Sequence, residues 1–363
     1  MFHLAIIWAF RLGKLFEKMG ICSQIHFIRF LMNIPQPGKD PKLLIKDAKF
    51  EHLPVRIYHP KGPYTGLRRG LLYIHGGCGM FGCNRTYERM CRYLARESDS
   101  VVVYIEYRLG PEYQHPIQLT DCLTATKYFM KNAKDYGVDP NRIILAGESC
   151  GGSICAAISR ELVKRDYPLK LRAQVLLYPL LQIVNVILPS YQQNRFGPGL
   201  TSKRGLKLGF QYLNEEVVDV DELLKNAHVP EDMREKYNKW IGADCIPEEF
   251  KARGYEPLAP APFRKELFKK ARLDDETLLS PILDEDAIIQ QLPETYILTC
   301  EYDILRDDGL LYKKRLEDND VPVTWHHLKD GFHGLITFIN AWPFEFSSTK
   351  AAFEGILSFI KRL

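Results

Sequence analysis

The fold is decided by the stretch Ile143-Ile-Leu-Ala-Gly-Glu-Ser-Cys-Gly-Gly-Ser-Ile-Cys-Ala-Ala157. An apolar run leads into a Gly-x-Ser-x-Gly turn, and small residues follow in a helical pattern. A strand, this turn and a helix together form a nucleophile elbow, which exposes the serine hydroxyl above a parallel sheet. Glycines stand at 147 and 151 because strand and helix approach too closely there for a Cβ. The pattern therefore predicts that Ser149 is a nucleophile.

Other apolar runs predict further strands, and helical patterns alternate with them. The expected strands are 55–58, 70–74, 101–105, 143–146, 174–178, 296–299 and 322–326. One helix is expected over 118–136, stopped by Gly137, and another over 351–363. This alternation favours βαβ units, and hence the α/β class with a mostly parallel central sheet and helices on both faces.

The stretch from about 183 to 265 interrupts the alternation. It is helix-like, rich in charged and aromatic residues, and contains many prolines. We predict that it forms a helical cap over the C-terminal edge of the strands, inserted into one domain that spans 51–363. Residues 1–50 predict an N-terminal helical segment that ends at Pro35-Gln-Pro-Gly38 and either contributes to the cap or lies near a membrane.

The first apolar run, Leu4–Phe10, is followed at once by charged residues. A bilayer span needs about 20 apolar residues, so this run is too short. It also lacks the basic start and the small-residue cleavage site of a signal peptide. The pattern favours an amphipathic helix packed on the protein body. The remainder of a membrane anchor, or a helix lying in the membrane interface, is the alternative.

Composition excludes several classes of function. A net charge of +4 over 363 residues, without a long block of Lys and Arg, argues against nucleic-acid binding. The nine cysteines include no Cys-x-x-Cys pair and no Cys/His ligand set. We therefore expect neither a metal nor another cofactor. A hydrophobic content of 46% is typical of a globular protein with a large core.

A serine hydroxyl needs a neighbouring base, and the base needs a carboxylate that orients it. In proteins with a nucleophile elbow, the acid follows the serine along the chain and the histidine follows the acid. His333 is favoured as the base because it lies between glycines just after an expected strand; the other histidines after Ser149 are His228, His326 and His327. Asp303 follows the strand 296–299 and is favoured as the acid. Glu301 is second, while Asp307 and Asp308 suit the start of the next helix.

A second loop supplies groups that would stabilise negative charge on a reacting carbonyl oxygen. The sequence His75-Gly-Gly-Cys78 follows the strand 70–74. Its glycines leave backbone N–H groups accessible, and each such donor is worth roughly 3–4 kcal/mol to the transition state. We predict an oxyanion hole made by the amides of Gly76, Gly77 and Cys150, the residue after the nucleophile. His75 is expected to brace this loop.

Five motifs in this order resemble those of the hormone-sensitive-lipase branch of the α/β-hydrolase superfamily: His75–Gly77, Tyr107–Glu112, Gly147–Gly152, Tyr302–Gly309 and Asp330–Gly334. Within this branch, the chain most resembles the arylacetamide deacetylase family, from about residue 45 to the end. The resemblance implies an α/β-hydrolase fold and a serine carboxylesterase or amidase. Its substrates would be lipophilic esters, arylacetamides or acylglycerols, and its triad Ser149, Asp303 and His333.

The resemblance also implies a location at the endoplasmic reticulum membrane, facing the lumen, although the full anchor of the family is missing here. Cys78 and Cys150 stand where the family commonly has glycine and alanine. These two departures motivate an alternative, a catalytically impaired protein that binds ligands on the same fold. Cys300 is expected near the oxyanion loop, which suggests a disulfide to Cys78 or Cys83. Asn84 begins a glycosylation sequon that chance explains equally well.

Overall fold

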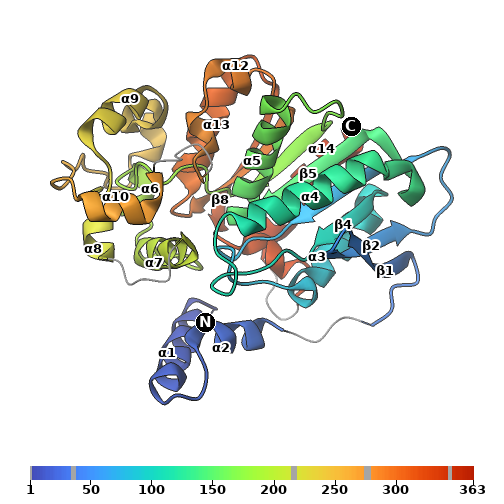
Figure 1. Ribbon diagram of the computed structural model, residues 1–363, viewed down its shortest axis with the longest axis horizontal. Coiled ribbons are helices and arrows are strands. Elements are labelled where there is room, and N and C mark those ends of the chain that lie inside the picture. Colours follow the sequence, from blue (N-terminus) through green and yellow to red (C-terminus); the bar gives the residue numbers. More distant parts are fainter. Residues whose placement is uncertain (1, 34–37, 214–218, 274–278, 342–345) are drawn as a thin grey trace.

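The computed structural model describes residues 2–33, 38–213, 219–273, 279–341 and 346–363 (Figure 1). Its centre is an eight-stranded sheet in the order β1-β2-β4-β3-β5-β6-β7-β8. The pairs β1/β2 and β2/β4 are antiparallel, and the remaining pairs are parallel. The predicted α/β-hydrolase fold is confirmed.

The strands are β1 (Leu43–Phe50), β2 (Leu53–Pro60), β3 (Arg68–Ile74), β4 (Val101–Ile105), β5 (Val138–Glu148), β6 (Ala173–Leu177), β7 (Glu294–Tyr302) and β8 (Val323–Phe332). The helices of the protein body are α3 (Asn84–Ser98), α4 (Ile117–Lys131), α5 (Cys150–Lys164), α12 (Asp286–Ile289), α13 (Arg306–Glu317) and α14 (Ser347–Arg362). The remaining helices are α1 (Phe2–Lys18), α2 (Gln24–Met32), α6 (Pro189–Gln193), α7 (Ser202–Leu213), α8 (Val220–Leu223), α9 (Glu231–Ile241) and α10 (Lys265–Ala271).

Both faces of the sheet are covered, and each carries its own hydrophobic core. Residues of α4, α5 and α13 pack on one face, and residues of α3 and α14 pack on the other. The central strands β3 and β4 are buried along their whole length, which explains their continuous apolar runs. The sheet therefore holds the loops at its C-terminal edge on a rigid base.

The helices α6 to α10 lie together beside the sheet, between β6 and β7 in the chain (Figure 1). Their position agrees with an inserted cap, but α10 begins at the residue where the predicted insertion ends. The backbone N–H of Arg264 donates to the carbonyl of Ala227, 2.7 Å away, which ties the start of α10 to the cap. The cap segment thus extends beyond 265.

The N-terminal segment 1–50 is not helical throughout: α2 ends at Met32, and residues 43–50 form a strand that the sequence analysis did not predict. Leu43–Phe50 forms the edge strand β1, which pairs with β2 through a tight turn in which Glu51 has a φ of 54°. Only the two end residues of β1, Leu43 and Phe50, are buried, so its sequence lacks the period-two alternation that would predict a strand. Helices α1 and α2 form a hairpin, and Arg29 of α2 donates to the carbonyl of Met80 at 2.8 Å.

Candidate active site

Ser149 lies at a sharp turn between β5 and α5. Its φ of 54° and ψ of −126° are rare for a residue with a side chain, and such strain is typical of a nucleophile elbow. A Cβ added to Gly151 would lie 2.2 Å from the carbonyl oxygen of Ile74, and one added to Gly147 would lie 2.5 Å from the carbonyl oxygen of Gly151. Close backbone approach therefore explains both glycines of the motif.

Three side chains from distant parts of the chain form one hydrogen-bonded series. Nε2 of His333 lies 3.0 Å from Oγ of Ser149, and Nδ1 of His333 lies 2.8 Å from Oδ2 of Asp303. Asp303 follows β7 directly, and its other carboxylate oxygen accepts the N–H of Leu305 at 2.9 Å. His333 follows β8, the neighbouring parallel strand, so both loops leave the same edge of the sheet. The structure brings together the three predicted residues.

The other histidines of the C-terminal half are engaged elsewhere. Nδ1 of His326 lies 3.2 Å from the hydroxyl of Tyr296, and Nδ1 of His327 lies 2.9 Å from that of Thr299. His228 is buried in the cap, with Nε2 2.9 Å from the carbonyl of Ile183. None of these contacts involves Ser149.

The acidic neighbours of Asp303 also have other partners. Glu301 lies 2.7 Å from Nε of Arg253 and 3.0 Å from Nη1 of Arg306. Asp307 and Asp308 lie at the start of α13, as the sequence indicated. Asp303 therefore stands alone among these acids in contacting His333.

The Asp303 carboxylate sets the electrostatics of the base. Burial alone lowers the pKa of His333, but the charge of Asp303 and its hydrogen bond outweigh burial and raise the pKa above its ordinary value of 6.5. The carboxylate also fixes the tautomer, because an Nδ1–H that donates to Asp303 leaves Nε2 free to accept the serine proton.

The oxyanion loop lies beside Ser149 as predicted, but one of the three predicted N–H donors has another partner. The N–H of Gly76 donates to Oε1 of Glu148 at 3.3 Å, so this amide is directed away from a reacting carbonyl. Gly76 is therefore corrected from an oxyanion donor to a support of the loop. Gly77 and Cys78 have φ values of 94° and 54°, a turn in which successive N–H groups can line a concave surface.

His75 lies behind this loop. Its ring stacks on Tyr107, with ring centroids 4.2 Å apart, and the hydroxyl of Tyr107 donates to the backbone carbonyl of His75 at 2.8 Å. Burial lowers the pKa of His75 to about 4, so its ring is neutral at physiological pH. These contacts hold His75 against Tyr107, which agrees with the prediction that His75 supports the oxyanion loop.

Glu148 is a site residue that the sequence analysis missed. It is buried, and its carboxylate accepts the hydroxyl of Tyr87 at 2.5 Å and that of Tyr178 at 2.6 Å, besides the amide of Gly76. The carboxylate thereby links the elbow to the oxyanion loop. The only sequence signal for this was a charged residue at the end of a strand that is otherwise apolar.

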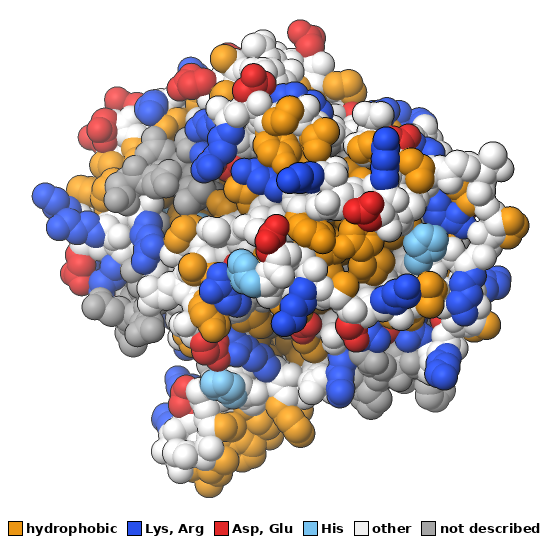
Figure 2. All heavy atoms as spheres, turned by 45° about the vertical axis from the view of Figure 1, so that its right-hand side comes forward, with side chains coloured by type: hydrophobic (Ala, Val, Ile, Leu, Met, Phe, Trp, Pro, Cys, Tyr) orange, Lys and Arg blue, Asp and Glu red, His pale blue; other side chains and the backbone are white. Residues whose placement is uncertain are grey.

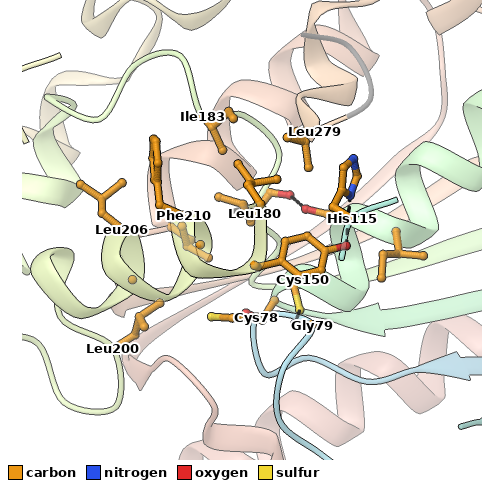
Figure 3. Close-up of a pocket in the computed structure, with 18 of the residues that line it drawn as sticks. Cys78, Gly79, His115, Cys150, Leu180, Ile183, Leu200, Leu206, Phe210 and Leu279 are labelled. Atoms are coloured by element: carbon orange, nitrogen blue, oxygen red, sulfur yellow. Dashed lines mark hydrogen bonds between the residues drawn. The ribbon is translucent and has the colours of Figure 1, made fainter. Parts of the chain in front are cut away.

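An apolar pocket of about 110 Å³ lies beside Ser149 (Figure 3). Its walls come from the body and from the cap, and include Leu180, Ile183, Leu200, Leu206 and Phe210. Cap helix α7 contributes Leu206, Phe210 and Tyr212 to the lining, whereas Tyr237 and Ile241 of α9 are buried within the cap. Among the described lining residues, none carries a formal charge.

The cysteines are all free thiols, so the proposed disulfide of Cys300 is wrong. Cys300 is fully buried in the core, paired with Leu328 of the neighbouring strand, whereas Cys78 lines the pocket and Cys83 contacts Thr86. Burial raises the pKa of the Cys78 thiol to about 12, which keeps it protonated and unreactive. Within the described residues, no group of His, Cys, Asp and Glu side chains is arranged to hold a metal ion.

The site defines the α/β-hydrolase class. It combines a strained elbow serine after β5, an aspartate after β7, a histidine after β8 and a glycine loop beside them. Comparison with known proteins agrees, because residues 71–238 and 256–337 match the family described as the alpha/beta hydrolase fold. Carboxyl esterase 2 from Tuber melanosporum has a similar structure, with a TM-score of 0.68 and 22% identity, covering 90% of this chain and 89% of that one.

Relatives define the family more narrowly. Human arylacetamide deacetylase-like 4 is 43% identical over 361 residues, which cover 99% of this chain and 88% of that protein. Bovine arylacetamide deacetylase is 38% identical over 308 residues, 84% of this chain and 77% of that protein. The chain belongs to the arylacetamide deacetylase family.

Proposed function

We propose that the protein hydrolyses lipophilic carboxylic esters, and amides of the arylacetamide type, through Ser149, His333 and Asp303. Family membership makes the chain an enzyme of the serine ester hydrolase class. The observation that carries the proposed mechanism is the hydrogen-bonded series from Ser149 to Asp303 at the wall of an apolar pocket.

In this mechanism Oγ of Ser149 attacks the carbonyl carbon while Nε2 of His333 accepts the hydroxyl proton. Asp303 orients the ring and stabilises the imidazolium that forms. The negative oxygen is held by the amides of Gly77, Cys78 and Cys150, with Cys78 taking the place first given to Gly76. His333 then donates its proton to the leaving group. In the second half of the reaction, His333 accepts a proton from a water molecule that attacks the acyl-enzyme, and it returns this proton to Oγ of Ser149 as the acid product leaves.

The volume of the pocket favours substrates with small acyl groups over substrates with long acyl chains. A cavity of about 150 Å³ in another protein holds one benzene ring. The cavity beside Ser149 is smaller, with a volume of about 110 Å³, so it accommodates a short acyl chain. Acylglycerols with long chains would need the cap to move. Acetyl and butyryl esters are therefore the first substrates to test.

A fluorophosphonate probe tests the mechanism, because it labels only an activated serine. Parent protein should be labelled and should hydrolyse para-nitrophenyl acetate, while Ser149→Ala should do neither. Ser159→Ala is the matched control, because Ser159 lies further along α5, donates its hydroxyl to the carbonyl of Cys155 and lies outside the pocket lining. An unlabelled parent protein would favour the ligand-binding alternative.

We also propose that the protein associates with the endoplasmic reticulum membrane through the α1–α2 hairpin. Of the helices in the described residues, none is long and apolar enough to cross a bilayer. The hairpin instead exposes large hydrophobic side chains, including Trp8 (65%) and Phe30 (74%). Figure 2 shows hydrophobic side chains gathered at this end of the molecule. Basic residues on α1 (Arg11, Lys14, Lys18) would favour anionic headgroups.

Sedimentation with lipid vesicles tests this surface. Binding should increase with phosphatidylserine content and decrease in the double variant Trp8→Ser/Phe30→Ser. Phe196→Ser is the control, because Phe196 is equally exposed (74%) but lies in the cap. Equal binding by all three proteins would refute the hairpin as the membrane contact.

A further inference from the structure

Besides Ser149, four side chains with a hydroxyl or imidazole group line the otherwise apolar pocket, and the proposed mechanism uses none of them: Ser153, Tyr191, His115 and Tyr212. The last two contact each other. His115 comes from the loop before α4, and Tyr212 comes from cap helix α7. Nδ1 of His115 lies 3.1 Å from the hydroxyl of Tyr212, and their rings meet edge to face with centroids 5.4 Å apart. In Figure 3, His115 lies at one end of the pocket and Leu200 and Leu206 at the other.

This pair lies close to the reacting groups. A Cβ on Gly79 would lie 2.4 Å from Cε2 of Tyr212, so the tyrosine ring rests directly on the oxyanion loop. The N–H of Gly79 in turn donates to Sγ of Cys150, the residue after the nucleophile, at 3.2 Å. A substrate group that reaches the pair must therefore be near the scissile carbonyl.

The cap also fixes His115 from its backbone side. The guanidinium of Arg272, which ends α10, donates to the carbonyl of His115 at 3.1 Å. His115 is only 7% exposed, and burial, followed by the charge of Arg272, lowers the pKa of its imidazole to about 4. The imidazole is thus neutral and held in place by two elements of the cap.

When a neutral imidazole is hydrogen-bonded to a hydroxyl, the pair keeps one free donor and one free acceptor, whichever tautomer the imidazole has. If Tyr212 donates to Nδ1, then Nε2–H remains a donor and the tyrosine oxygen an acceptor. If Nδ1–H donates to Tyr212, then the tyrosine O–H is the donor and Nε2 the acceptor. A hydroxyl group satisfies both positions, because it donates one hydrogen bond and accepts others.

We propose that His115 and Tyr212 form a hydrogen-bonding subsite for a neutral hydroxyl group next to the scissile ester, so that the enzyme prefers hydroxy-acid esters or partial esters of polyols over their alkyl counterparts. The subsite rests on the proposed esterase function. It excludes charged substrates, because no described residue lining the pocket could compensate a buried charge. A substrate that lacks the hydroxyl leaves the remaining donor and acceptor of the pair without a partner, so it is bound less tightly in the transition state.

Two substrate pairs of matched shape test the proposal. Ethyl lactate and ethyl isobutyrate place a hydroxyl or a methyl group on the acyl side, and hydroxyethyl and propyl isobutyrate do so on the alcohol side. Hydrolysis is followed by acid release, and kcat/KM is compared within each pair. The parent enzyme should prefer the hydroxyl member of at least one pair. Tyr212→Phe and His115→Phe should each reduce that preference about five- to tenfold.

Tyr113→Phe is the matched control, because Tyr113 is exposed on the same loop and lies outside the pocket lining. Its preference should equal that of the parent enzyme. Variants that stay folded and active with unchanged preference in both pairs would overturn the subsite, as would an equal loss on both members of a pair. A parent protein that hydrolyses none of the four esters would instead refute the proposed esterase function.

Discussion

Replacing Glu148 with glutamine is expected to slow the chemical step while leaving substrate binding nearly unchanged. The carboxylate of Glu148 accepts three hydrogen bonds, from Gly76, Tyr87 and Tyr178, and touches no pocket surface. Glutamine has nearly the same shape but offers one oxygen acceptor and one NH₂ donor. At least one of the three donors must then lose its acceptor within a buried site.

The size of the effect follows from these contacts. An unsatisfied buried donor costs about 1–3 kcal/mol, which should appear in the free energy of unfolding. Removing one oxyanion donor reduces kcat by roughly 10²–10³, which sets the upper limit if the loop moves out of place. The bond from Gly76 is long at 3.3 Å, so a partial shift is expected. We predict that kcat decreases roughly 10- to 100-fold, or about 1.4–2.7 kcal/mol.

Steady-state kinetics with para-nitrophenyl acetate, together with urea unfolding, would measure both effects. Glu97→Gln is the control, because this glutamate on α3 pairs with its neighbour Arg96 near the surface and contacts no part of the elbow or the oxyanion loop among the described residues. A Glu148→Gln enzyme with unchanged kcat would refute the link between Glu148 and the oxyanion loop. A variant that raises KM alone would place Glu148 in substrate binding instead.

Three further outcomes are expected. Because His333 must be neutral to accept a proton and its pKa is raised above 6.5, kcat/KM should fall with decreasing pH through a midpoint above that value; a midpoint below it would contradict the pairing with Asp303. Gly79→Ala should push Tyr212 off the loop and destabilise the fold by about 1–3 kcal/mol in urea unfolding, whereas Gly62→Ala, which meets no atom within 4 Å, should not. Thiol titration of unfolded, unreduced protein should detect nine free cysteines, and a lower count would reveal a disulfide.

The sequence predicted those site residues whose position follows from local patterns. Ser149 is recognisable because the elbow needs glycines at fixed spacing, and His333 and Asp303 because each follows a strand at the same sheet edge. The donors of the oxyanion hole were less predictable. Whether the amide of Gly76 faces a substrate or Glu148 depends on side chains that meet only in the folded sheet. The partnership of His115 with Tyr212 likewise joins two segments 97 positions apart in sequence.

The acids that follow Asp303, in the first turn of α13, connect the catalytic loop after β7 to the walls of the pocket. The carboxylate of Asp308 accepts the N–H of Leu181 at 3.0 Å, and that of Asp307 accepts the N–H of Ser190 at 2.6 Å. These two bonds hold the segment that leads from β6 into the cap, which carries pocket walls from Leu180 onwards. Asn194 completes the connection by donating to the carbonyl of Asp303 itself at 2.9 Å. Any displacement of this cap segment must therefore disturb the triad acid, so pocket shape and catalytic geometry are mechanically coupled.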